Sequence, residues 1–387
     1  MGPLRGLKVV EFAGLGPAPF AAMMLADMGA DVIRVSRPGP SALGGMSTGH
    51  RGFVPVTVDL KDPAGQELAA RLVESSDVLI EGFRPGVMER LGLGPDRCLE
   101  RRPSLVYARM TGYGQDGPLS GAAGHDINYI SVAGVLGAIR RHGERPLFPL
   151  NLVGDFGGGG MILAFGVVCA VLEARASGQG QVVDAAMVDG AALLATTVHA
   201  MRSAGQWPAD PGGNVLDSGA HFYEVYETAD GRHVAVGALE PPFYAALCQL
   251  IGVDAQTMPQ WDRPRWPEFK QRLAAIFRTR PRDEWVALAE GTDACLSPVL
   301  LLDEAPAHPH NRARGTFMEF DGAVLPAPAP RLSRTPAEAR PASGDIDVEQ
   351  VLVEWGIPAD DARRWCAGGA VWPATTGDSD ATGPTAG

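Results

Sequence analysis

Apolar runs alternate with amphipathic segments over the first half of the chain. Apolar runs at 7–14 and 31–38 predict buried strands, and the segment 18–30 between them has the apolar spacing of a helix. Further strands are predicted at 56–63, 76–85 and 104–114, with an amphipathic helix at 64–75. Strands that alternate with helices are typical of a parallel sheet covered on both faces. We therefore expect a Rossmann-like, doubly wound α/β large domain over residues 1–200.

The pattern changes after residue 200. A Gly- and Pro-rich stretch predicts a linker at 201–222, and alternating apolar and polar residues around Asp230 and Gly231 then predict an antiparallel hairpin. Helical patterns at 243–252 and 282–290 complete a smaller α+β domain, expected at 223–315. We expect a return segment to the large domain at 316–365. A flexible tail is expected at 366–387, whose last residues lack any apolar period.

The composition is that of a soluble globular protein, with 45% apolar and 20% charged residues among 387. The net charge of −12 argues against a nucleic-acid partner, because phosphate backbones require a basic surface. Five scattered cysteines favour reduced thiols and no zinc site. The longest apolar run, 161–172, is too short to span a bilayer, and the first residues lack a secretory signal. We expect a cytoplasmic protein without membrane insertion.

The sequence GLGPAP at 14–19 follows the first predicted strand, where a dinucleotide-binding fold carries G-x-G-x-x-G. Pro19 stands at the third glycine position, and Pro17 lacks the amide that a phosphate would bind. The second strand ends in RVSRP and not in the acidic residue that binds a ribose hydroxyl. The pattern therefore indicates a Rossmann-like fold that does not use NAD.

Arginine and lysine residues cluster in loops and strand ends of the same domain. Each by itself is typical of a solvated surface, but open α/β sheets bind ligands at such strand ends, and arginine pairs well with phosphate. The candidates for an anion pocket are Arg34, Arg37, Arg51, Lys61, Arg84 and Arg90.

Two ionisable residues, His125 and Asp126, precede a segment with helical apolar spacing. Asp126 is the natural N-cap, which leaves His125 on the entrance loop, where the positive end of the helix dipole favours a neutral imidazole. A structural hydrogen bond is the alternative interpretation of a single histidine. Glu240 ends the second strand of the hairpin, where Pro241 stops the ladder, and a carboxylate there could orient an imidazole.

Asp155 closes a strand-like segment in NLVGDFGGGG, and a long apolar helix follows the four glycines. Asp155 could be the N-cap of that helix, with the glycines making a tight connection. Alternatively, the glycines let a ligand approach, and the amides of the helix start face an anion or oxyanion. Two bases on separate loops beside such amides suit removal of a proton next to a carbonyl and its return from the other face.

Four motifs occur in one order: GHDINY at 124–129, NLVGDFGGGG at 151–160, GQGQVVDAAMVDG at 178–190 and VAVGALEP at 234–241. Together they resemble those of the α-methylacyl-CoA racemases, within the family III CoA-transferase fold, and the resemblance runs from residue 5 to about 335. It implies that His125 and Asp155 are the two catalytic bases and that Glu240 pairs with the histidine. It also implies an enolate oxygen near the backbone amide of Asp155.

The resemblance further implies an acyl-CoA substrate and no metal or redox cofactor, because the thioester itself accepts the electron pair. The residues that would hold CoA or line the thioester end are Arg37, Val58, Asp59, Leu60, Lys61, Gly82, Phe83, Arg84, Arg90, Gly124, Asp126 and Tyr129. Members of the family form interlocked homodimers, so Glu240 would serve the His125 of the partner chain.

These observations lead to three functional hypotheses. The first is racemisation of 2-methylacyl-CoA in lipid or fatty-acid metabolism. The second is CoA transfer, with Asp155 as a covalent nucleophile. The third is a catalytically inactive acyl-CoA-binding protein. The acyl group stays open, because branched fatty acyl, sterol side-chain and 2-arylpropionyl thioesters share the enolate chemistry.

Overall fold

The computed structural model describes residues 2–39, 51–207, 210–342 and 347–373. The chain forms two compact units. Unit 1 is built from residues 1–133, 149–194 and 317–387, and unit 2 from 134–148 and 195–316. The segment 134–148, which was expected in the large domain, therefore groups with unit 2. There the backbone of Arg141 and His142 approaches Gly212 closely.

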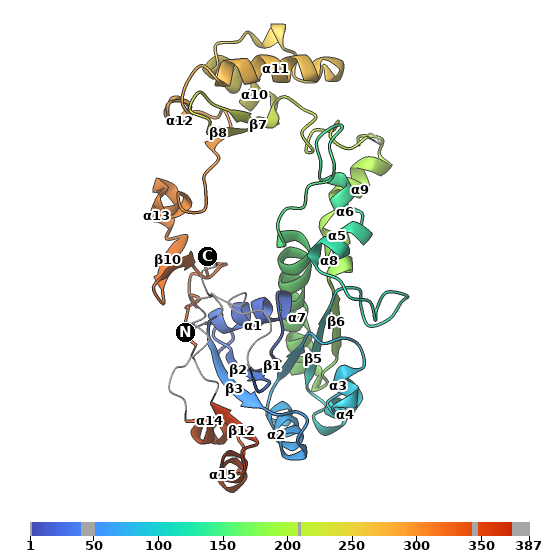
Figure 1. Ribbon diagram of the computed structural model, residues 1–387. Helices are drawn as coiled ribbons and strands as arrows, with labels where there is room; N and C mark the ends of the chain where they lie inside the picture. Colours follow the sequence, from blue (N-terminus) through green and yellow to red (C-terminus); the bar gives the residue numbers. More distant parts are fainter. Residues whose placement is uncertain (1, 40–50, 208–209, 343–346, 374–387) are drawn as a thin grey trace, which may run out of the picture. The chain divides into compact units, whose positions relative to one another are not determined.

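Unit 1 is organised around a mixed sheet (Figure 1). Over the described residues, its seven strands are, in spatial order, β12 (Val371–Pro373), β3 (Phe53–Val58), β2 (Asp31–Ser36), β1 (Lys8–Phe12), β4 (Val78–Glu81), β5 (Val106–Thr111) and β6 (Val182–Ala186). Strands β3, β2, β1, β4, β5 and β6 pair in parallel, each with its neighbour in this order. Among the described residues of this sheet, only β12 pairs antiparallel, with β3. The order reverses at β1, since β2 lies on one side of it and β4 on the other.

Alternate side chains of each strand enter two different cores, which is why the strands are apolar throughout. Val9, Val32 and Ile80 belong to one core, with α1 (Pro17–Asp27) and α7 (Met161–Ser177). Val10 and Ile33 belong to the other. The helices on that second face are α2 (Pro63–Glu74), α4 (Pro95–Arg101), α14 (Val348–Glu354) and α15 (Ala359–Ala367). The predicted doubly wound α/β fold is confirmed.

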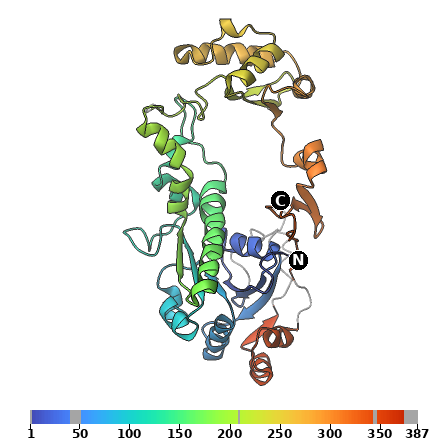
Figure 2. The ribbon, with the colours of Figure 1, turned by 180° about the vertical axis from the view of Figure 1, so that it is seen from behind.

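The helices of unit 1 begin where local chemistry allows it. The side chain of Asp62 accepts the amide of Ala64, and Pro63 occupies the first turn of α2. Such a cap stabilises a helix by about 1 kcal/mol. Figure 2 shows the long helix α7, which contacts α1, β5 and β6. The remaining elements of unit 1 are α3 (Val87–Arg90), α5 (Asp126–Val132), the π-helix η2 (Leu152–Gly160), α8 (Met187–Leu194), β10 (Phe317–Phe320) and β11 (Ala323–Pro326).

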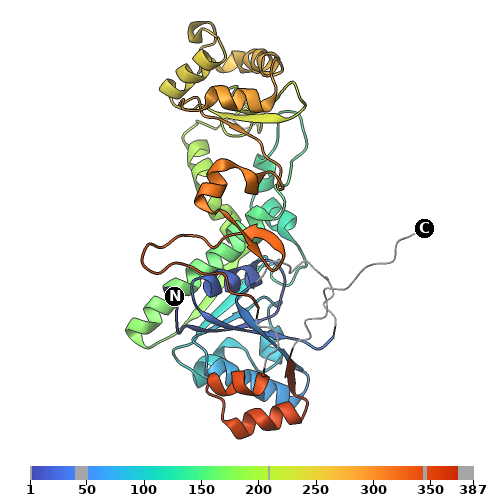
Figure 3. The ribbon, with the colours of Figure 1, turned by 90° about the vertical axis from the view of Figure 1, so that its left-hand side faces the viewer.

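Residues 366–373, the first part of the expected flexible tail, are ordered, so the prediction was wrong for them. Helix α15 continues to Ala367 and β12 pairs with β3, and the side chains of Trp365 and Val371 are buried in the core, which holds this segment in place. Figure 3 shows α14 and α15 in red. The rest of that prediction, 374–387, lies outside the described residues.

Helix α7 continues directly from η2, so that Leu152–Ser177 forms one helical stretch of 26 residues. By length and composition alone this stretch could cross a membrane. The apolar run 161–172, which the sequence showed to be too short to span a bilayer, is only part of it. Leu163 and Val167 are fully buried against the sheet. Its other side exposes Met161, Phe165 and Leu172, and the stretch therefore combines a core face with an uncovered apolar face.

Unit 2 contains the predicted antiparallel hairpin. Strands β7 (Tyr223–Glu227) and β8 (His233–Gly237) pair across the turn at Asp230–Gly231, and β9 (Leu296–Pro298) pairs with β8. Phe222, inside the expected linker 201–222, is fully buried in the core of this unit. The other elements are α6 (Val135–Ala138), α9 (Thr196–Ser203), α10 (Pro241–Leu250), η3 (Ala255–Thr257), η4 (Arg263–Arg265), α11 (Trp266–Phe277), α12 (Arg282–Ala289), η5 (Ala305–Ala307) and α13 (Pro309–Arg314).

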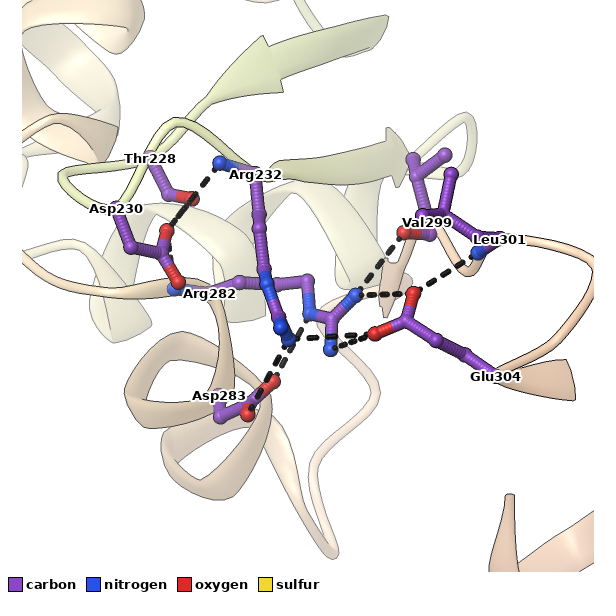
Figure 4. Close-up of polar contacts among 8 residues, drawn as sticks. All are labelled: Thr228, Asp230, Arg232, Arg282, Asp283, Val299, Leu301 and Glu304. Carbon is purple, nitrogen blue, oxygen red and sulfur yellow. Dashed lines mark hydrogen bonds and ion pairs between the residues drawn. The ribbon is translucent and has the colours of Figure 1, made fainter. Parts of the chain in front are cut away.

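A polar network connects the hairpin turn to the segment that leaves unit 2 (Figure 4). The buried guanidinium of Arg282 donates to both carboxylate oxygens of Glu304, at 3.0 Å each, and to Asp283 at 2.9 Å. The backbone amide of Arg282 donates to Asp230 of the turn at 3.2 Å. Bidentate pairs of this kind fix geometry as well as adding stability.

Candidate active site

A cavity of about 710 Å³ opens at the carboxyl edge of the sheet in unit 1. The loops after β1 and β4 line it, and the strand order reverses between these two strands, which is where open α/β sheets bind ligands. Other lining residues come from the loop after β5, from the start of α5 and from η2. The polar side chains among them are Arg84, Thr111, Tyr113, Ser120, His125, Asn128, Tyr129, Asn151 and Asp155.

His125 lies at the end of the long loop after β5 and is the N-cap residue of α5. Its backbone amide donates to Asn128 Oδ1 at 3.1 Å, and its carbonyl accepts the amide of Asn128 at 2.8 Å. The hydroxyl of buried Tyr129 donates to the carbonyl of Gly124, immediately before the histidine. The backbone on both sides of His125 is therefore held, while its imidazole is exposed along the cavity wall.

Asp155 lies within the π-helix η2, not at the end of a strand. The strand-like interpretation was wrong, and so was the interpretation of Asp155 as an N-cap. A short apolar run such as the one before Asp155 fits a buried strand as well as a buried helix, and only the packing of the folded chain distinguishes the two. A side chain at Gly190 of α8 would lie 1.8 Å from the carbonyl oxygen of Gly158. The glycines thus let α8 touch the backbone of η2, and a π-helix is an element that often marks functional sites.

The carboxyl group of Asp155 is half-buried and faces the cavity. Burial raises the pKa of this carboxyl above its ordinary value. A hydrogen bond from Asn151 Nδ2, at 2.9 Å, opposes that rise, Asp126 adds to it, and His125 opposes it. A carboxylate with a raised pKa is a better proton acceptor than an exposed one.

Asp126 connects the start of α5 with η2. It is buried, and its Oδ2 accepts the backbone amides of Gly154 at 2.6 Å and Asp155 at 2.8 Å. Asp126 was expected to cap its own helix, but His125 takes that position, and the Asp126 carboxylate is close enough to bind the amides of η2 instead. One residue therefore holds His125 and Asp155 on the same cavity.

This contact corrects the expectation for the enolate oxygen. The backbone amide of Asp155 already donates to Asp126, so it is paired within the chain. A carboxylate is a strong acceptor for an amide, and an incoming oxygen would have to compete with it. The amide of Asp155 is thus not a free donor facing the cavity.

Two residues near Asp155 were not predicted from the sequence. Asn151, one helical turn before Asp155, donates to its carboxylate. Gly16, in the loop after β1, has a φ of 67°, and a side chain there would lie 3.3 Å from Asp155 Oδ2. Asn151 and Asp155 are four residues apart, a spacing that brings two side chains together on a helix. The contact could therefore be predicted only if the segment was expected to be helical.

The residues proposed for CoA divide into two groups. Gly82, Phe83, Arg84, Gly124 and Tyr129 line the cavity. Asp126 lies behind it, buried, as described above. The others follow the carboxyl ends of neighbouring strands or lie in α3 and are not part of the cavity wall: Arg37 after β2, Val58, Asp59, Leu60 and Lys61 at the end of β3, and Arg90 in α3.

Two of the arginines considered for the anion pocket have other partners. Arg34 is buried, donates to Glu11 at 2.8 Å and stacks over Phe53 at 3.7 Å. Arg51 makes a bidentate pair with Asp27 at 2.7 and 2.8 Å. Their predicted role as free anion ligands was wrong, because each guanidinium is already neutralised by a buried carboxylate.

Glu240 lies in unit 2, at the end of the loop after β8. It is the N-cap residue of α10, and its side chain is exposed. Strand β8 ends at Gly237, so the prediction that Glu240 ends the strand was wrong. Pro241 and Pro242 instead open the helix that follows Glu240. Burial raises the pKa of the Cys295 thiol, and the negative charge of Glu240 raises that pKa further.

Comparison with known proteins identifies the family. The model of CoA-transferase family III matches residues 4–345. The chain belongs to CoA-transferase family III. It is 46% identical to the α-methylacyl-CoA racemase of Mus musculus, over 92% of this chain and 93% of that protein. It is 44% identical to the α-methylacyl-CoA racemase of Homo sapiens, over 92% and 94% of the two chains.

A family III fold is also found among solved structures. A crystal structure of a hypothetical protein from Mycobacterium tuberculosis superposes with a TM-score of 0.75 at 28% identity, covering 89% of this chain and 97% of that one. The region that matches the family includes His125, Asp155 and Glu240, so both units belong to the family III chain.

Proposed function

We propose that this protein is an α-methylacyl-CoA racemase that inverts the configuration at C2 of 2-methylacyl-CoA thioesters. The observation that carries the proposal is that His125, at the start of α5, and Asp155, in η2, line one cavity at the strand-order reversal of the sheet. The high identity to two racemases over most of the chain supports the same assignment.

The reaction needs two bases and an acidified carbon. One base takes the proton from C2, and the electron pair of that C–H bond moves into the thioester carbonyl to give an enolate. The other residue, in its protonated form, returns a proton to the opposite face of C2, which re-forms the thioester. In this proposal His125 and Asp155 are those two residues, and the raised pKa of Asp155 suits it to both roles.

CoA is proposed to bind along the carboxyl edge of the sheet. Gly82, Phe83 and Arg84 line the cavity there, and Arg37, Lys61 and Arg90 supply positive charge near the same strand ends. No metal or redox cofactor is part of the proposal, because the thioester carbonyl accepts the electron pair. We expect α-proton exchange to survive dialysis against EDTA.

We also propose that the protein is an interlocked homodimer in which Glu240 serves the His125 of the partner chain. The exposed apolar side of α7 supports an assembly, since Phe165 is 69% exposed and Leu172 63% exposed. Soluble monomers rarely leave contiguous apolar stripes of this kind uncovered. Each carboxylate would then orient and charge-pair an imidazole. The cytoplasmic location and the absence of membrane insertion stay predictions.

The test is incubation of one enantiomer of a 2-methylacyl-CoA in deuterium oxide. We expect deuterium at C2 and loss of optical purity, and we expect Asp155→Ala and His125→Ala to abolish both. A panel of branched fatty acyl, sterol side-chain and 2-arylpropionyl thioesters would then identify the acyl group.

The alternative is CoA transfer with the Asp155 carboxylate as nucleophile. Membership of CoA-transferase family III and the position of Asp155 in the cavity wall support this second candidate. Transfer of CoA to a free carboxylic acid, without exchange of the α-proton, would establish it in place of racemisation. If Asp155→Ala left every rate unchanged, the protein would instead be an inactive acyl-CoA binder.

A further inference from the structure

Three neighbouring strands carry charged residues in one row near the cavity. Glu81 at the end of β4 is the register partner of Arg109 on β5, and Arg109 is the register partner of Asp184 on β6. Register partners on adjacent strands point to the same face of a sheet. Glu81 is fully buried and Arg109 is 6% exposed. Buried charges are costly unless they are paired, so the contacts of this row matter.

Arg109 binds two carboxylates at once. Its Nε donates to Glu81 at 2.8 Å, and its Nη1 donates to Glu89 at 2.9 Å. Glu81 uses its other oxygen to accept the backbone amide of Phe83, at 2.8 Å. Glu89 belongs to α3 and directly precedes Arg90. The single guanidinium therefore connects the loop that lines the cavity with the helix next to it.

Asp184 extends the row to the loop after β5. Its Oδ2 accepts the backbone amide of Gln115 at 3.1 Å. Burial raises the pKa of the Asp184 carboxyl, while the Gln115 amide and the charge of Arg109 oppose the rise. That loop continues to His125. Arg109 thus lies between two carboxylates that each hold a loop of the cavity: Glu81 holds the loop after β4 and Asp184 holds the loop after β5. Arg109 is not itself part of the cavity wall.

We propose that Arg109 is a positioning residue for the acyl-CoA site. It fixes the backbone at Phe83 through Glu81 and the helix that carries Arg90 through Glu89. The inference rests on the proposed function, because it assumes that acyl-CoA occupies this cavity. A planar guanidinium is needed for it, since one ammonium group cannot present the same fork to two carboxylates.

The test is Arg109→Lys, which keeps the charge that buried Glu81 requires. We expect the KM for a 2-methylacyl-CoA to rise roughly tenfold and kcat to change by less than about threefold, because substrate binding is weakened and the two bases are untouched. Glu89→Gln, at the exposed partner, should raise KM in the same direction by a smaller factor without endangering the fold.

Arg102→Lys is the matched control. Arg102 donates to Asp77 at 2.9 Å and to the carbonyl of Glu74 at 2.9 Å, at the opposite end of β4 from the cavity. It should leave KM and kcat as in the unmodified protein. If Arg102→Lys and Arg109→Lys raised KM equally, the effect would be general loosening of the sheet and the proposal would be overturned.

Calorimetric titration with the same thioester separates this proposal from the proposed function. Weaker binding to Arg109→Lys than to the unmodified protein supports the positioning role, and equal binding overturns it. An unmodified protein that binds the thioester but never exchanges its α-proton would overturn the racemase assignment and leave the role of Arg109 standing.

Discussion

Two side chains act on the proton affinity of Asp155 in opposite directions. Asp126 raises the pKa of the Asp155 carboxyl by its charge, and Asn151 lowers it by a hydrogen bond. A base works only when deprotonated, so the acidic limb of the pH–rate profile follows this pKa for the enantiomer whose C2 proton Asp155 takes. We predict that Asp126→Asn moves that limb to lower pH and that Asn151→Ala moves it to higher pH. The measurement is kcat/KM for proton exchange against pH.

Shifts of the same sign in the two variants would contradict this account. Asp126→Asn should also weaken the hydrogen bonds from the amides of Gly154 and Asp155. A hydrogen bond to a charged acceptor contributes about 1.5–3 kcal/mol to the free energy of unfolding, and part of this is lost in the variant. A lower free energy of unfolding for that variant alone is therefore part of the expected result.

His221 gives unit 2 a dependence on pH. The ring is fully buried, and its Nε2 donates to the hydroxyl of Tyr244 at 2.8 Å, because that hydroxyl donates in turn to the carbonyl of Met258. Burial and, to a smaller extent, the charge of Lys270 together lower the pKa of His221 to about 4. The unfolded chain, with the ordinary value of 6.5, then binds the proton more readily than the folded one.

Stability should accordingly be complete above pH 6.5 and fall as the pH drops towards 4, by roughly 3 kcal/mol in all. We predict that His221→Gln flattens the free energy of unfolding over this window, as measured by urea denaturation at several pH values. His233→Gln, at an exposed histidine, is the control. An unchanged slope in His221→Gln would remove this explanation.

At the scale of elements, η2 depends on close packing against α8. Because an added methyl group at Gly190 would lie 1.8 Å from the Gly158 carbonyl oxygen, η2 or α8 must move. We predict that Gly190→Ala lowers kcat at least tenfold through displacement of Asp155 and also lowers Tm. Gly137→Ala in α6, where an added methyl group meets nothing within 4 Å, should leave both unchanged. Equal activity in the two variants would show that η2 does not need this contact.

At the scale of the whole molecule, the proposed homodimer makes each site depend on two chains. His125→Ala and Glu240→Ala should each be inactive. If Glu240 serves the partner's His125, mixed dimers contain one intact site, and random reassembly of the two variants should restore about a quarter of the activity. The measurement is proton exchange after joint refolding. No recovery in verified mixed dimers would place both residues of a site in one chain.

Local patterns were sufficient for most of the secondary structure of both units. The strands β1, β2, β4 and β5 lie where apolar runs predicted them, and the hairpin turns at Asp230–Gly231. These elements bury their own periodic side chains, so the pattern in the chain and the packing agree. The segment around Asp155 differed, because glycines disfavour a helix and the run packs closely against both α8 and α1, which its own pattern does not show.

The sequence by itself determined the doubly wound architecture, the residue types of a two-base site and, through ordered motifs, the family. Only the tertiary structure decided which arginines are free to bind an anion. The carboxylates that pair with two of them, Glu11 with Arg34 and Asp27 with Arg51, are distant in the chain. It likewise decided that Asp126 binds the amides of η2 and so brings His125 and Asp155 to one cavity. Periodicity records whether a residue is buried, whereas the choice among possible polar partners depends on distances that exist only after folding.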